Sequence, residues 1–138
     1  FGKVYYNRPT EVARMEQYRL AEGEYRFACI VWDHEPVSSG VLVDLCREEL
    51  GWKKSTVYTV LRKLMDRGVL RNEGAVVTSL VSREQVQRYE SEQLIDRTFG
   101  GSLPSFLAAF MGSRTLSDGE AEELKALIDR HRKEDGHG

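Results

Sequence analysis

Residues 51–68 alternate apolar and polar positions in a pattern that predicts a short amphipathic helix. Successive apolar positions lie three, one, three and one residues apart, which places them on one buried helical face. These positions are Val57, Val60, Leu61, Leu64 and Met65. The opposite face is polar and basic, and it carries Ser55, Tyr58, Thr59 and Arg62, with Lys53 and Lys54 at its start. Periodicity alone also fits an ordinary surface helix, so the flanking segments decide whether this is a DNA-recognition helix.

Both ends of this helix carry local signals. Gly68 follows the last apolar position and can adopt the positive φ that commonly ends a helix. At the other end, Gly51-Trp52-Lys53 predicts a tight turn, and Ser55 is the expected N-cap.

Two more helices are predicted ahead of that turn. Residues 22–33 are apolar on most sides, as in a helix packed against several neighbours, and Pro36 ends this helix because it restricts the preceding residue. Residues 39–50 form the second helix, with Ser38 or Ser39 as its cap. Two short helices joined by a turn that contains glycine match the helix-turn-helix pattern.

The segment after Gly68 predicts a β-hairpin. Residues 69–71 and 75–80 are rich in β-forming side chains, and Asn72-Glu73-Gly74 between them suits a short turn. Three helices followed by a hairpin make a winged helix. We therefore expect a mainly α fold with a small β-hairpin wing: a winged helix-turn-helix followed by a C-terminal helical region.

The C-terminal third predicts three further helices. Ser82 and Ser117 each begin a capping-box pattern, for helices to about residues 98 and 132, and a very apolar helix spans 103–111. Helices this short cannot form a thick core, so a symmetric partner is the simplest cover for them, and folding back on the winged domain is the alternative.

We expect a leader at residues 1–19, a winged-helix DNA-binding domain at 20–81 and a helical dimerisation region at 82–138. The expected dimerisation residues are Leu94, Phe99, Phe106, Leu107, Phe110, Leu124, Leu127 and Ile128.

The charge is unevenly distributed. The whole chain has a net charge of −2, yet residues 51–72 hold six cations against Asp66 alone, so that this segment carries +5 and the rest −7. A local basic patch on an acidic protein still attracts a phosphate backbone. Lysine and arginine neutralise phosphates, and arginine, serine and threonine also bond base edges.

These residues make the chain resemble the penicillinase-repressor (BlaI/MecI) family, which includes the copper-responsive CopY repressors. The resemblance runs from Leu20 to about Arg132. Its landmarks are Ile30-Val31-Trp32, Pro36-Val37-Ser38-Ser39, the run WKKSTVYT from Trp52 to Thr59, and FGGSLP from Phe99 to Pro104. It implies a homodimeric repressor on a palindromic operator in double-stranded DNA. The expected DNA contacts are Lys53, Lys54, Ser55, Thr56, Tyr58, Thr59, Arg62, Lys63, Arg67 and Arg71.

The resemblance also implies a mode of induction. In such regulators a membrane-bound sensor protease cuts the dimerisation segment before a phenylalanine that corresponds to Phe99. Asparagine commonly precedes that phenylalanine, and this chain has Thr98 there. The alternative is that Phe99 only packs between helices.

Other chemistry is disfavoured. Cys29 and Cys46 lie on the inner faces of predicted helices and are expected to be buried thiols, with a redox pair as the alternative. Their spacing fits no metal site, and the C-terminal cysteine pairs of copper sensing are absent from the sequence, so we expect no metal and no cofactor. No catalytic motif is present, so we expect no enzyme. The lack of a long apolar run and of a secretory signal predicts a cytoplasmic protein without membrane insertion.

The leader, residues 1–19, has two interpretations. Phe1–Arg14 precedes the resemblance, and Met15 lies where related proteins commonly start. The leader is therefore expected to be a cloning remnant or a wrongly extended start, with a DNA-binding arm that uses Arg8, Arg14 and Arg19 as the alternative.

The alternative function for the whole chain is a winged helix that binds a protein partner, although such helices usually present aromatic or aliphatic anchors.

Overall fold

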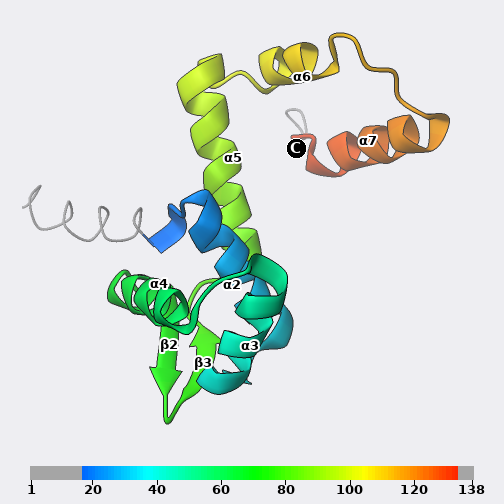
Figure 1. The fold of residues 1–138 in the computed structure, drawn as a ribbon. Coiled ribbons are helices and arrows are strands. Elements are labelled where there is room, and N and C mark those ends of the chain that lie inside the picture. Colours follow the sequence, from blue (N-terminus) through cyan, green and yellow to red (C-terminus); the bar gives the residue numbers. More distant parts are fainter. Residues whose placement is uncertain (1–16, 134–138) are drawn as a thin grey trace, which may run out of the picture. The chain divides into compact units, whose positions relative to one another are not determined.

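The computed structural model describes residues 17–133 of the chain. The leader's residues 1–16, with Arg8 and Arg14, and residues 134–138 lie outside this range. The elements in chain order are α2 (Glu22–His34), β1 (Val37–Ser38), α3 (Ser39–Leu50), α4 (Lys54–Asp66), β2 (Leu70–Glu73), β3 (Val76–Ser79), α5 (Arg83–Phe99), α6 (Leu103–Met111) and α7 (Asp118–His131) (Figure 1). They form two compact units that divide between Leu94 and Ile95, within α5. The mainly helical winged-helix architecture is confirmed.

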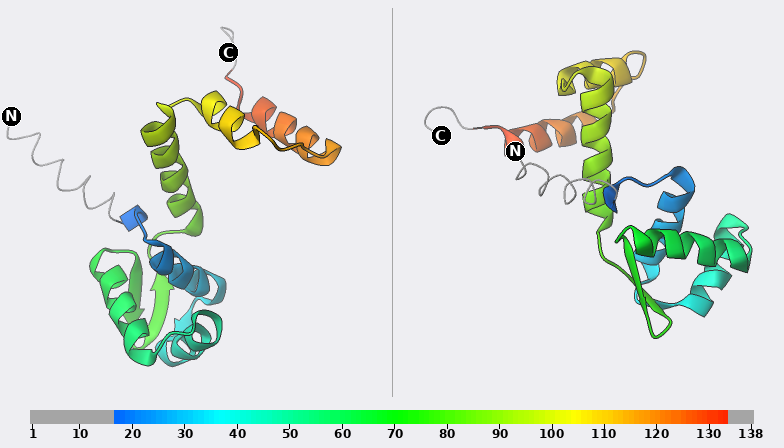
Figure 2. Two further views of the ribbon diagram at one scale, coloured as in Figure 1. Left: turned by 45° about the horizontal axis from the view of Figure 1, so that its top comes forward. Right: turned by 90° about the vertical axis from the view of Figure 1, so that its left-hand side faces the viewer.

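Unit 1 is built around one apolar core. Figure 2 shows α2, α3 and α4 gathered together, with the β2–β3 hairpin projecting beyond them. The three helices and the sheet each contribute fully buried side chains, because each has one apolar face. The largest of these side chains are Phe27, Val31, Leu42, Leu61, Leu64 and Leu70.

The sheet has one strand more than the sequence suggested. Its three antiparallel strands lie in the order β1-β3-β2, and Val37 of β1 pairs with Val77. A strand of two residues is too short to leave a periodic signal, and only its pairing with β3 defines it.

The turn of the wing differs from the prediction. Glu73 pairs with Val76, so Gly74 and Ala75 alone form the turn, with φ of 59° and 63°. Two successive positive φ values are typical of the tight hairpin turn whose twist matches that of the strands. The predicted turn, Asn72-Glu73-Gly74, was therefore wrong, because Asn72 and Glu73 belong to β2.

Most predicted helix ends agree with the structure. The Ser38 hydroxyl caps α3 by accepting a hydrogen bond from the Val41 N–H at 3.1 Å. After α4, Gly68 has φ 77°, its N–H donates to the Met65 carbonyl, and the Val69 N–H donates to the Leu64 carbonyl. This pair of bonds is the Schellman arrangement, so Gly68 ends the helix as expected.

Two expectations for α4 were wrong. The helix starts at Lys54, so Lys53 occupies the cap position and makes no side-chain cap bond, whereas Ser55 lies inside the first turn. Met65 is 37% exposed, although it was expected on the buried face with Leu61 and Leu64. It lies at the margin of the apolar stripe, where the core does not cover it.

Unit 2 contains the end of α5 together with α6 and α7. The hydroxyls of Ser102 and Ser117 cap the two later helices by accepting hydrogen bonds from Ser105 and Glu120. No described residue from 95 to 133 is buried. This segment therefore has no internal core of its own within the described range.

Candidate nucleic-acid interface

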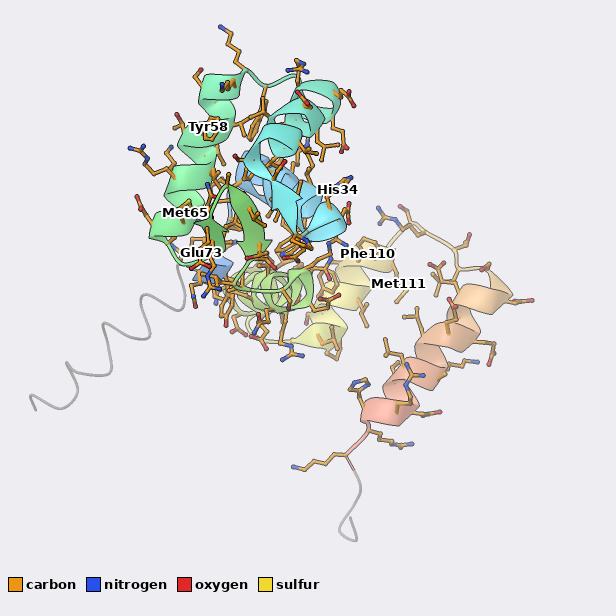
Figure 3. The ribbon with its side chains drawn as sticks, turned by 90° about the horizontal axis from the view of Figure 1, so that it is seen from below. His34, Tyr58, Met65, Glu73, Phe110 and Met111 are labelled. Carbon is orange, nitrogen blue, oxygen red and sulfur yellow. The ribbon has the colours of Figure 1, made fainter. Side chains whose placement is uncertain are left out.

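The outer face of α4 presents the polar side chains that the sequence singled out. Lys53, Lys54, Ser55, Thr59, Arg62 and Lys63 are exposed, Tyr58 is 38% exposed, and Thr56 is half-buried. The helix is held from behind by Val57, Leu61 and Leu64, which are inserted into the core. Figure 3 shows Tyr58 and Met65 along this same helix. Burial of one side thus fixes the direction of the other.

The first turn of α4 leaves backbone donors without partners. The earliest amide in this region with a backbone partner is that of Val57, which donates to the Lys53 carbonyl at 3.1 Å. The N–H groups of Lys54, Ser55 and Thr56 have no hydrogen-bond partner among residues 17–133. Such amides, at the positive end of the helix dipole, can bind an anion such as a phosphate oxygen. These amides were not predicted from the sequence, although the lack of a capping side chain at position 53 was a usable signal.

The cations near α4 fall into two groups. Lys53, Lys54, Arg62 and Lys63 form no ion pair within the described part of the chain. Arg71 lies on β2 and approaches Glu73 at 3.8 Å, with both side chains largely exposed, so water screens this contact and leaves Arg71 able to bind elsewhere. These four cations therefore lie at the start of α4 and in its C-terminal half.

Arg67 forms the second group, the cations that are paired within unit 1. One guanidinium nitrogen, Nη1, donates to both carboxylate oxygens of Glu24 at 3.1 and 3.0 Å, and Nη2 donates to the Arg19 carbonyl. Beside it, the Gln17 side chain donates to the Gly68 carbonyl at 3.0 Å. These contacts fasten the C-terminal end of α4 to α2 and to the segment before it. The structure thus separates Arg67 from the exposed cations with which the sequence had grouped it.

All of the predicted dimerisation residues except Leu94 belong to unit 2, and Leu94 is the last residue of unit 1. Leu94, Phe110, Leu127 and Ile128 are exposed, and Phe99, Phe106, Leu107 and Leu124 are half-buried. Ile128 is 59% and Phe110 51% exposed, which is unusual for large apolar side chains in a helix. Thr98 is exposed in the last turn of α5, and the ring of Phe99 packs edge-to-face on Phe106 at 5.4 Å between centroids.

The two cysteines differ. Cys46 is fully buried, and burial, with a smaller contribution from Glu49, raises the pKa of its thiol to about 11. Cys29 is only half-buried, so the expectation of two buried thiols was wrong for it. It lies at a less enclosed part of α2.

Metal-binding and membrane-spanning features are absent from residues 17–133. This range contains no group of three or more histidine, cysteine or carboxylate side chains placed to hold a metal ion. No helix in the same range is long and apolar enough to cross a bilayer.

Comparison with known proteins identifies the family of this chain. Residues 20–130 match the penicillinase repressor family. The methicillin resistance regulatory protein MecI of Staphylococcus aureus strain Mu50 is 22% identical over 117 residues, which cover 82% of this chain and 95% of that protein. The penicillinase repressor of Bacillus licheniformis is 22% identical over 118 residues, covering 83% of this chain and 92% of that protein. With nearly its whole described length matched, the chain belongs to the penicillinase repressor family, whose members are DNA-binding regulators and not enzymes.

Proposed function

We propose that this protein is a homodimeric, sequence-specific repressor that places α4 of each subunit in the major groove of a palindromic operator. The observation that carries the proposal is the outer face of α4 and its N-cap. There, four cations that form no ion pair among the described residues accompany the exposed residues Ser55 and Thr59. A major groove accepts one α-helix and presents a distinct set of donors and acceptors for each base pair.

The side chains of α4 divide into two roles under this proposal. Lys53, Lys54 and the free amides of the first turn lie where phosphates approach a helix N-terminus, so they hold the helix on the backbone. Arg62 projects from the exposed face one turn after Tyr58 and binds a guanine edge through two hydrogen bonds. Ser55 and Thr59 lie on the same face and add shorter polar contacts.

Dimerisation through unit 2 is supported by its exposed apolar side chains. A soluble monomer rarely leaves several large apolar side chains uncovered on neighbouring helices. A second copy of the same segment can bury them against its own apolar side chains. The twofold symmetry of such a dimer matches that of a palindromic site.

Induction by proteolysis is the remaining part of the proposal. A membrane-bound sensor protease cuts between Thr98 and Phe99, which weakens the dimer and releases the operator. The bond lies in the last helical turn of α5, just before Gly100 and Gly101 with φ of 59° and 83°. Helix ends fray more easily than helix centres, so this turn is an accessible place to unwind. The contact of Phe99 with Phe106 supports the competing role, in which Phe99 only packs.

One observation favours the alternative function, a helix that binds a protein partner. Tyr58 and Met65 are both more than one third exposed and lie seven residues apart on one flank of α4. Two such side chains are a small anchor set for a protein interface, whereas the cations suit phosphates. We therefore prefer DNA.

Selection of bound duplexes from random DNA by the full chain tests the proposal. We expect one enriched palindrome with half-sites about one helical turn or a multiple of it apart. The variant with Lys53→Ala and Arg62→Ala should lose the enrichment. A control with Lys125→Ala and Arg130→Ala removes the same charge from α7 and should retain it. Recovery of no enriched sequence by the folded dimer would reject the proposal.

A further inference from the structure

The connection from the wing to α5 is bound by side chains from the end of α2. The indole N–H of Trp32 donates to the Val81 carbonyl at 3.0 Å. The Glu35 carboxylate accepts the Ser79 N–H at 2.7 Å and the Ser79 hydroxyl at 2.9 Å. This segment is therefore held along its length and does not behave as a loose linker.

Arg83, the first residue of α5, also binds the end of α2. Its Nη2 donates to Asp33 Oδ1 at 2.6 Å and to the Cys29 carbonyl at 3.4 Å. Its guanidinium carbon lies 5.5 Å from the centroid of the Trp32 ring, within the range of a cation–π contact. We name Trp32, Asp33, Glu35 and Arg83, with the backbone of residues 79–81, the α2–α5 clamp.

The first turns of α5 continue this attachment. Ser82 and Gln85 form a reciprocal capping box, with each side chain accepting the other's backbone N–H at 3.0 and 2.8 Å. Val86 is fully buried in the core of unit 1. The start of α5 is thus integral to the winged domain, and Arg83 lies where the direction of the helix is set.

The ion pair of the clamp contributes little to the free energy of folding. The side chains of Arg83 and Asp33 are 34% and 56% exposed, and partly exposed ion pairs contribute little to stability. A planar guanidinium that meets a carboxylate, a carbonyl and an aromatic face at once restricts orientation more than it adds free energy. Its geometry therefore suggests a positioning role.

Resting on the proposed function, we propose that Arg83 is a positioning residue that fixes the direction in which α5 leaves the winged domain. A dimer joined through stiff helices holds its two recognition helices at one separation, and so it favours one spacing of half-sites. If α5 can swivel at its start, one dimer reaches several spacings, but each with a lower effective concentration of the second recognition helix. Arg83 acts without touching DNA.

Operators of different spacing test this role in the full-length dimer. The probes are the selected palindrome, the same palindrome with about half a helical turn inserted, roughly five base pairs, and a single half-site. We expect the wild type to lose roughly tenfold or more in affinity on insertion. Arg83→Ala should bind the original palindrome roughly tenfold more weakly and lose less than about threefold on insertion, with its half-site affinity unchanged.

Matched variants separate positioning from charge. Arg88→Ala removes the same charge from an exposed position of α5 and should keep the spacing preference of the wild type. Asp33→Asn removes an acid, so it strengthens binding if Arg83 contacts phosphate, whereas it reproduces the loss of spacing preference if Arg83 positions α5. Arg83→Lys keeps the charge without the planar fork and serves in place of Arg83→Ala if that variant unfolds.

The outcomes distinguish the two proposals. Failure of the wild-type dimer to bind any selected duplex overturns the proposed function. Binding by the wild type without a spacing preference overturns the role of Arg83, and so does an unchanged preference in folded Arg83→Ala and Asp33→Asn. Loss of the preference in both variants, with Arg88→Ala unaffected, supports the inference.

Discussion

Arginines that look alike in the sequence have different surroundings in unit 1. Arg62 projects from the exposed face of α4 without an ion pair in the described residues, and Arg67, five positions later, binds Glu24 and a backbone carbonyl. The first is therefore free to meet a ligand, while the second is committed to the fold. The difference follows from position: Glu24 and the Arg19 carbonyl lie within hydrogen-bond reach of Arg67, whereas Arg62 is exposed.

Substitutions on α4 should separate base reading from phosphate binding. Arg62→Ala should cost about 1–3 kcal/mol per half-site and relax the preference at one base position. Lys53→Ala should weaken binding to all sequences alike and reduce the salt slope by about one unit for each phosphate that is no longer neutralised. A competition assay across single-base operator variants at two salt concentrations measures both effects. If Lys53→Ala changes the base preference and Arg62→Ala only the salt slope, the roles are reversed.

Arg67→Ala should lower stability instead of phosphate affinity. Removing it leaves the Glu24 carboxylate, whose side chain is only 17% exposed, without its cationic partner and with one hydrogen bond, from the Ala21 N–H. After allowance for solvent screening, we expect unfolding to become easier by about 1–2 kcal/mol, with the salt dependence of DNA binding unchanged. Urea unfolding and binding at several salt concentrations measure the two quantities. Lys63→Ala, which removes an exposed cation without an ion pair in the described range, is the control and should leave stability unchanged. A reduced salt slope in Arg67→Ala would contradict this assignment.

Among the elements of the winged domain, α4 has two ends that differ in their hydrogen bonds. No side chain among the described residues caps its start, which leaves amides available for an anion, and its end is closed by the Gly68 bonds and by Arg67. The helix that presents the cations is therefore open at one end and fastened at the other.

Gly68→Ala tests the fastened end. A Cβ at this position would require a side chain at φ 77° and would lie 3.0 Å from the Gln17 amide nitrogen. We expect a loss of about 1–2 kcal/mol in the free energy of unfolding, measured by urea denaturation. Gly40→Ala in α3 is the control, since its Cβ would meet nothing within 4 Å, and it should stabilise the protein by about 0.5–1 kcal/mol. Equal effects of the two substitutions would show that the positive φ is not the cause.

Across the molecule, the two units differ in how they bury apolar surface. Unit 1 has a closed core of its own, whereas the described part of unit 2 has none. The family match covers both units. Under the proposed function, unit 1 binds DNA and the exposed apolar helices of unit 2 join the two subunits.

Truncation should convert a dimer into a folded monomer. A fragment that ends at Leu94 keeps Val86, which completes the core of unit 1, and loses α6 and α7. Sedimentation should show a dimer for the full chain and a monomer for this fragment, with circular dichroism to confirm that it is folded. A fragment that ends near Ser82 is a poorer choice, because it removes Val86 and opens the core. A stably dimeric fragment ending at Leu94 would place the dimer interface in unit 1.

Local signals in the sequence were enough to define the helices and the polar face of α4. Amphipathic periodicity, Gly68 and the capping serines act over a few neighbouring residues, so α3 and α6 begin and end where the pattern predicted. The winged-helix class followed from the order of these elements, because short segments with one apolar face have few ways to bury it.

The neighbours that those residues meet could be learned only from the folded chain. The two-residue strand β1, the exposure of Met65, the ion pair of Arg67 and the α2–α5 clamp all depend on contacts between segments distant in the chain. Arg83 lies 50 residues from Asp33, and no local pattern marks such a pair. The physical reason is that periodicity reports which side of an element is buried, whereas packing determines what lies against it.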